Sequence, residues 1–103
     1  MAVGDDVPAF AIAGNYPNPF NPSTVISYEL PRAQRVTVAV YDAAGRRVAE
    51  LVDGHREMGT HQVRWDGRDD DGRRLSNGIY FYELSRDGRA TTQQLLLLQY
   101  GFR

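Results

Sequence analysis

The chain has 103 residues, a formal net charge of -1 and no cysteine. This length accommodates one domain, and the absence of cysteine excludes disulfides, thiolate metal sites and a cysteine nucleophile. The near-neutral charge lacks the basic excess that nucleic-acid binding requires, so no nucleic-acid partner is expected. With 42% hydrophobic and 24% charged residues, the composition is that of a globular domain stabilised by packing alone.

Residues 1–14 are predicted to form a linker or N-terminal arm, and residues 15–103 the folded domain. The domain begins with the proline-rich segment Asn15-Tyr16-Pro17-Asn18-Pro19-Phe20-Asn21-Pro22-Ser23-Thr24. Each proline removes a backbone donor and disfavours helix at the residue before it, so the segment is predicted to be extended and rich in turns. Tyr16 and Phe20 are its expected apolar anchors, and the Asn18 and Asn21 side chains are expected to close local turns.

Short runs of strand-forming residues follow, separated by turn signals such as Asp-Gly. Apolar and polar side chains alternate in most of these runs, and none has a sustained helical period. The predicted strands are 24–30, 35–41, 47–52, 60–65, 78–85 and 89–99. Many short strands with glycine-rich turns predict an all-β fold, an immunoglobulin-like antiparallel β-sandwich of about seven strands.

Aromatic residues gather in the run 78–85, where Tyr80, Phe81 and Tyr82 alternate across the strand. One face has to pack on the core, and the other presents both tyrosines to solvent or to a second sheet. An exposed tyrosine stripe is typical of sugar-binding surfaces, although aromatic residues are also ordinary strand residues in any sandwich. Trp65, at the end of the run 60–65, is predicted to be buried as the large aromatic in the middle of the core.

Two features invite a chemical interpretation. The acidic segment from Asp66 to Gly72 offers several oxygen ligands to a hard cation, but its spacing does not fit an EF-hand loop, and Asp-Gly pairs favour turns. A solvated turn is therefore predicted, with no metal or cofactor assigned, and calcium binding at Asp69–Asp71 stays open. His55 and His61 lack a nucleophile in a recognisable context, so no catalytic residue is predicted and the chain is expected not to be an enzyme.

The last run contains four consecutive leucines followed by an aromatic tail. This pattern indicates either a central strand buried on both faces or an apolar edge strand that contacts a partner. In the second case, self-association through an edge strand is also expected. The candidate residues for partner recognition are Leu95, Leu96, Leu97, Leu98, Gln99, Tyr100, Phe102 and Arg103.

Four motifs stand in a fixed order along the chain: the proline-rich segment 15–24, VYDAAGRRV at 40–48, HQVRWDGRD at 61–69 and LSNGIYFY at 75–82. Together they resemble the C-terminal sorting domains of the bacterial type IX secretion system, which are related to the immunoglobulin-like domain of the flagellar hook-capping protein family. The residues that carry this signature are Asn15, Tyr16, Pro17, Asn18, Pro19, Phe20, Asn21, Pro22, Trp65, Asp66, Gly67, Gly78 and Tyr80. The stretch 93–99 departs from the family pattern, because it lacks a basic residue and Arg103 is the only late cation.

The resemblance implies a non-catalytic C-terminal module that directs export and cell-surface attachment of a larger secreted bacterial protein. The implied partners are the outer-membrane secretion and attachment machinery and a covalently linked N-terminal passenger domain. The implied location is secreted or at the cell surface, reached through the periplasm. Two alternatives remain: a structural or spacer module of the hook-cap type, and a carbohydrate-binding module that uses the tyrosine face.

Overall fold

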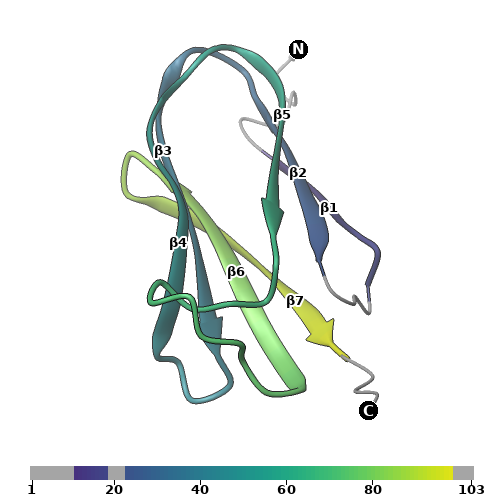
Figure 1. Ribbon diagram of the computed structural model, residues 1–103. Coiled ribbons are helices and arrows are strands. Elements are labelled where there is room, and N and C mark those ends of the chain that lie inside the picture. The colour runs from purple at the N-terminus through teal and green to yellow at the C-terminus, as the bar shows by residue number, and fades with distance from the viewer. Residues whose placement is uncertain (1–10, 19–22, 99–103) are drawn as a thin grey trace.

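The computed structural model describes residues 11–18 and 23–98, which form two stacked antiparallel sheets (Figure 1). The three-stranded sheet has the order β1-β2-β5 and consists of β1 (Ala11–Tyr16), β2 (Thr24–Leu30) and β5 (Gly59–Trp65). The four-stranded sheet has the order β4-β3-β6-β7 and consists of β3 (Gln34–Asp42), β4 (Arg47–Arg56), β6 (Gly78–Arg86) and β7 (Arg89–Leu97). The predicted immunoglobulin-like sandwich of about seven strands is confirmed. The described residues contain no helix long and apolar enough to cross a membrane.

The strands lie close to their predicted ranges, with two differences. β1 begins at Ala11, inside the range 1–14 for which the sequence predicts a linker or arm. β4 continues past Val52 to Arg56, because Asp53 and Gly54 keep pairing with β3 instead of forming a turn. An ion pair between Asp53 and Arg35 of β3 accompanies this continuation.

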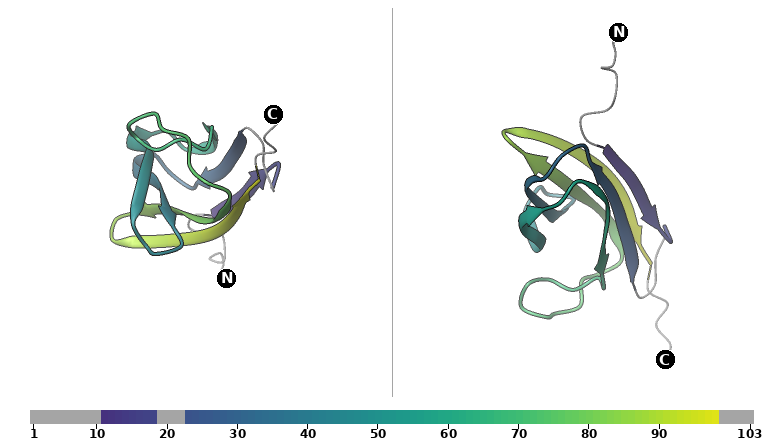
Figure 2. Two further views of the ribbon diagram at one scale, coloured as in Figure 1. Left: turned by 60° about the horizontal axis from the view of Figure 1, so that its bottom comes forward. Right: turned by 90° about the horizontal axis from the view of Figure 1, so that it is seen from above.

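The chain enters and leaves the sandwich at opposite ends (Figure 2). Ala11 pairs with Glu29, near the end of the three-stranded sheet where β2 finishes. Leu97 pairs with Gly78, at the opposite end, where β6 begins. The start of β1 and the end of β7 are therefore separated by the length of the sandwich.

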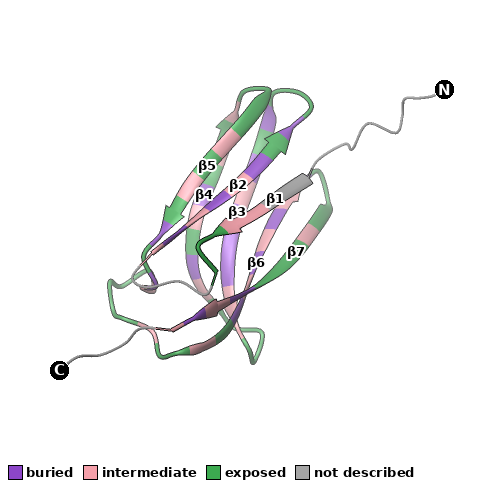
Figure 3. Cartoon of the chain, turned by 90° about the vertical axis from the view of Figure 1, so that its right-hand side faces the viewer, coloured by how far each residue is buried: buried purple, intermediate pink, exposed green. Residues whose placement is uncertain are grey.

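The core lies between the sheets and is built from alternate residues of facing strands (Figure 3). Period-two alternation gives β2 and β6 one buried face each, so the apolar positions read from the sequence there become the core. One cluster of buried residues surrounds Trp65 and comprises Ile26, Val40, Ala49, Trp65, Tyr80, Tyr82, Leu95 and Leu97. A second cluster fills the other half and comprises Tyr28, Leu30, Val36, Val38, Val52 and Leu84.

Trp65 is 2% exposed, which confirms its predicted burial. Its ring meets Tyr80 edge-on, with centroids 5.7 Å apart and an interplanar angle of 70°, a favoured geometry for aromatic pairs. Its indole N–H donates to the carbonyl oxygen of Arg68 at 2.9 Å. The Tyr80 hydroxyl donates to the carbonyl oxygen of Ser76 at 2.7 Å. The same pair of rings thus fills the core and holds both ends of the loop between β5 and β6.

Two expectations for aromatic side chains meet different outcomes. Tyr80 and Tyr82 face the second sheet and are buried, so they form no exposed stripe for a sugar. Tyr16 is 82% exposed, and the prediction that it anchors the proline-rich segment is wrong. Its backbone pairs with Val25 in the β1–β2 ladder, but its side chain points to solvent. Phe20, the second expected anchor, lies outside the described residues.

Replacing Trp65 with alanine is expected to lower the free energy of unfolding by about 3–5 kcal/mol, because it removes a large buried ring and leaves a cavity. Trp65→Phe retains much of the volume and should cost less. Denaturant titrations followed by far-UV circular dichroism measure both changes. An unchanged unfolding midpoint in the alanine variant would contradict the central role of this ring.

Candidate functional site

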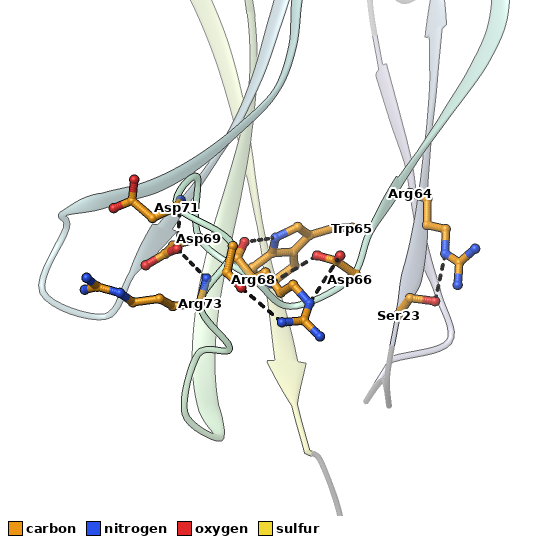
Figure 4. Close-up of polar contacts among 9 residues, drawn as sticks. Ser23, Arg64, Trp65, Asp66, Arg68, Asp69, Asp71 and Arg73 are labelled. Atoms are coloured by element: carbon orange, nitrogen blue, oxygen red, sulfur yellow. Dashed lines mark hydrogen bonds and ion pairs between the residues drawn. The ribbon is translucent and has the colours of Figure 1, made fainter.

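The acidic segment predicted as a turn is a hydrogen-bonded turn (Figure 4). Asp69 Oδ1 accepts the backbone N–H groups of Asp71 and Arg73, each at 2.9 Å. Asp66 Oδ1 accepts the N–H of Arg68 at 3.2 Å, and its Oδ2 lies 3.7 Å from the Arg68 guanidinium. These carboxylates therefore stabilise the backbone of the loop, as short polar side chains commonly do in turns.

Asp70 forms its hydrogen bonds outside the loop, unlike Asp66 and Asp69, and so attaches the loop to the edge strand β4. Its backbone N–H donates to the carbonyl oxygen of Val48 at 3.1 Å. Its Oδ1 accepts the N–H of Glu50 at 3.0 Å. In the part of the chain that the structure describes, no group of three or more His, Cys, Asp or Glu side chains is placed to hold a metal ion.

The two histidines lie near the connection between β4 and β5. The His61 ring stacks on Tyr28, with centroids 5.5 Å apart, and its Nε2 lies 2.6 Å from the carbonyl oxygen of Glu57. His55 Nδ1 lies 3.9 Å from the Glu57 carboxylate. Both histidines thus make contacts typical of packing and of a surface loop.

The start of the proline-rich segment is fixed by a network around Asn15. Asn15 Nδ2 donates to Thr24 Oγ1 at 3.1 Å, and the Thr24 hydroxyl donates to the carbonyl oxygen of Pro17 at 2.7 Å. From the opposite sheet, the Tyr82 hydroxyl donates to Asn15 Oδ1 at 3.3 Å. Thr24 and Tyr82 are fully buried, and buried hydroxyls need partners. The Asn15 carboxamide supplies them to both sheets.

Asn18 reaches across to β7 instead of closing a local turn, which corrects the expectation for its side chain. Its Oδ1 accepts the backbone N–H of Leu96 at 2.9 Å. The sequence does not reveal the contacts of Asn15 with Tyr82 and of Asn18 with Leu96, because these partners are more than sixty residues away along the chain. Four further signature residues of this segment lie outside the described residues; they are Pro19, Phe20, Asn21 and Pro22.

β7 is an edge strand, because it pairs with β6 alone at the end of its sheet. Leu95 and Leu97 are buried in the core, whereas Leu96 and Leu98 are half-buried. Of the two alternatives that the sequence left open, the central strand is wrong, because β7 is an edge strand with one face in the core. Contact of this strand with a partner stays a prediction. The remaining candidate recognition residues lie outside the described residues; they are Gln99, Tyr100, Phe102 and Arg103.

The outer face of the four-stranded sheet carries an apolar strip beside β7, here called the outer strip, formed by Tyr41, Ile79, Phe81 and Leu96. Register places Tyr41 opposite Phe81 and Ile79 opposite Leu96, so all four side chains share one face. Ile79 is 44% exposed, and the other three are half-buried. The strip therefore presents apolar surface next to the C-terminal end of the described chain.

Comparisons with known proteins agree with this architecture. A model of the FlgD Ig-like domain matches residues 20–89. Among solved structures, dimeric latent PorU from Porphyromonas gingivalis is similar with a TM-score of 0.70 and 21% identity, over 88% of this chain and 9% of PorU. PorZ of the same organism, described as an essential bacterial surface component of the type IX secretion system, is similar with a TM-score of 0.59 and 21% identity, over 85% of this chain and 11% of PorZ.

FlgD from P. aeruginosa is similar with a TM-score of 0.57 and 32% identity, over 73% of this chain and 60% of FlgD. The chain therefore spans less than two thirds of each of these three proteins. At 21% identity, the likeness to PorU and PorZ shows a shared fold. A search of curated protein sequences finds no match.

Calcium and chelators are expected to leave the melting temperature unchanged, because Asp66 and Asp69 already accept backbone N–H groups within the turn. A ligand that binds only the folded state must raise stability by mass action, so thermal unfolding with and without calcium tests this directly. Magnesium serves as the control for ionic strength. A rise specific to calcium would place a cation site in the acidic turn.

Alkaline pH is expected to destabilise the fold in part through Tyr82. Burial raises the pKa of Tyr82 to about 12, above its ordinary value of 10.0. Because the folded-state pKa exceeds the unfolded-state value, the contribution to stability is complete below pH 10.0 and is lost as the pH rises through about 12. Denaturant titrations at increasing pH should therefore give a shallower loss of unfolding free energy in Tyr82→Phe than in the wild type. Equal slopes in the two proteins would contradict this assignment.

Proposed function

The chain belongs to the FlgD Ig-like domain family, and from this premise we propose that it is a non-catalytic module that directs export and cell-surface attachment of a larger secreted bacterial protein through the type IX secretion system. The passenger is linked covalently before β1, and the outer-membrane secretion and attachment machinery binds at the C-terminal end of β7. The protein then passes through the periplasm and is secreted or held at the cell surface.

The observation that carries this proposal is the position of the last strand. β7 lies at an edge of its sheet, so its leucines contribute to the core on one side and, through Leu96, to the accessible surface on the other. An edge strand with alternate apolar side chains suits recognition through main-chain groups and side-chain pockets. The fold shared with PorZ, itself described as a surface component of this secretion system, adds support.

A structural or spacer module of the hook-cap type is the second candidate. The family match favours it, since FlgD-type Ig-like domains are structural modules. The 32% identity with FlgD from P. aeruginosa, over 73% of this chain, adds support. The third alternative, a carbohydrate-binding module, loses its supporting observation, because Tyr80 and Tyr82 are buried between the sheets.

The sorting role predicts that the chain, fused after a periplasm-directed reporter in a host with the type IX machinery, carries the reporter to the cell surface or the medium. Replacing the tail 100–103 with serines should abolish export, and the melting curve of the same variant shows whether the fold is intact. Gln62→Ala is the matched control, since Gln62 is exposed on the other sheet, and it should export normally.

The outcomes separate the candidates. Export that persists after the tail replacement moves recognition onto the folded surface, and Ile79→Thr in the outer strip then tests that location. If the intact fusion stays in the periplasm while a known sorting domain is exported beside it, the sorting role is wrong and the spacer role is favoured.

A further inference from the structure

The edges of the four-stranded sheet differ in how they are covered. Edge strands expose unpaired backbone groups that readily pair with another strand. The edge of β4 is covered where Asp70 binds the backbone of Val48 and Glu50. The edge of β7 is covered at Leu96 by Asn18. The rest of β7 makes no comparable contact within the described residues.

The direction of the β7 backbone groups follows from the Asn18 contact. The Leu96 N–H donates to Asn18, so it points away from β6. In an antiparallel pair, residues that bond to the neighbouring strand alternate with residues that do not. Ala90, Thr92 and Gln94 therefore also direct their N–H and C=O groups outward. We call residues 90–94 the free edge.

The hairpin that precedes β7 independently shows which β7 residues direct their backbone groups outward. Asp87 and Gly88 form its two-residue turn, with φ angles of 45° and 78°, which are the positive values of a type I′ hairpin. Arg86 pairs with Arg89 across this turn. Such a turn is closed by a hydrogen-bonded pair, so Arg89 and every second residue after it bond to β6, and the residues between them face outward.

The free edge lacks the features that normally protect an edge strand. Charged residues, prolines and bulges are the usual protections. Residues 90–98 contain no charged residue and no proline, and the β6–β7 register runs from Gly78 to Arg86 without a shift. By contrast, the β1–β2 and β3–β4 ladders are both interrupted by register shifts.

We propose that the free edge pairs antiparallel with the same edge of a second copy of this chain, so that the two four-stranded sheets become one continuous sheet. A two-fold axis at Thr92 places Ala90 opposite Gln94 of the other copy and Thr92 opposite its own counterpart. All of these residues direct their backbone groups outward, so the edge is complementary to itself, as an isologous interface requires. In this register Arg89 lies opposite Leu95, which keeps the two arginines apart.

Asn18 limits the length of this pairing. It occupies the backbone N–H of Leu96, and the Asp87–Gly88 turn ends the strand on the other side. A pairing this short buries less than the roughly 1,200 Å² of a standard stable interface. The dimer is therefore weak and forms only at high concentration of the chain, unless Asn18 is removed.

The test is sedimentation equilibrium of the 103-residue chain up to millimolar concentration, with amide hydrogen exchange measured at low and high concentration. Protection of the Thr92 and Gln94 amides should rise with concentration. Thr92→Pro removes an outward N–H without a loss to the β6 ladder, so it should weaken association by at least about tenfold with an unchanged melting curve. Thr92→Val keeps the N–H and the branched shape, and it should associate like the wild type.

Asn18→Ala tests whether Asn18 limits the length of the pairing, because this variant should associate more strongly than the wild type. It frees the Leu96 N–H, so that a shifted register with the two-fold axis at Gln93 can pair Ala90 with Leu96 of the other copy and Thr92 with Gln94. This longer pairing should strengthen association severalfold. A wild-type chain that stays monomeric at millimolar concentration overturns the proposal. Equal association of the wild type and Thr92→Pro also overturns it, because the interface then lies elsewhere. Weaker association of Asn18→Ala would overturn the role of Asn18 as the limit of the edge.

Discussion

The side of the sandwich where β1 lies near β7 depends on the hydrogen bonds of the Asn15 carboxamide. This carboxamide receives a hydrogen bond from Tyr82 in one sheet and donates to Thr24 in the other, so two buried hydroxyls are satisfied by one side chain. Burying a hydroxyl without a partner costs free energy, and this ties the start of the proline-rich segment to a fixed place between the sheets. Asn18 lies beside β7 as a consequence, and its position decides how much of that edge remains available.

Loop side chains also cover the edges of the four-stranded sheet. Asp70 covers part of β4, and Asn18 covers part of β7. Both residues belong to loops, and each accepts a strand N–H with a side-chain oxygen. Loop side chains thus do locally what a neighbouring strand does in a closed barrel. Asn18 of the proline-rich segment and Asp70 of the acidic segment therefore act on the two edges of this sheet.

The strands and the burial of Trp65 could be predicted because alternation is a local property of the sequence. The partners of Asn18 and Asp70 could not, since these contacts join segments far apart in the chain. The exposure of Tyr16 and the continuation of β4 through Gly54 depend on register with neighbouring strands, which local turn signals do not reveal. The edge position of β7 also required the topology. The recognition role of residues 95–103 remains a prediction from the sequence.

The entry of the chain at one end of the sandwich and its exit at the other have a mechanical consequence. In the proposed sorting role, a force that pulls the start of β1 away from the end of β7 would act along the strands. It therefore slides β1 along β2 and β7 along β6, and many ladder hydrogen bonds resist it together. Peeling would break these bonds one after another. Forced unfolding is governed by the unfolding rate rather than by equilibrium stability. The direction of the force along the strands can therefore slow the unfolding of a domain that has no disulfides.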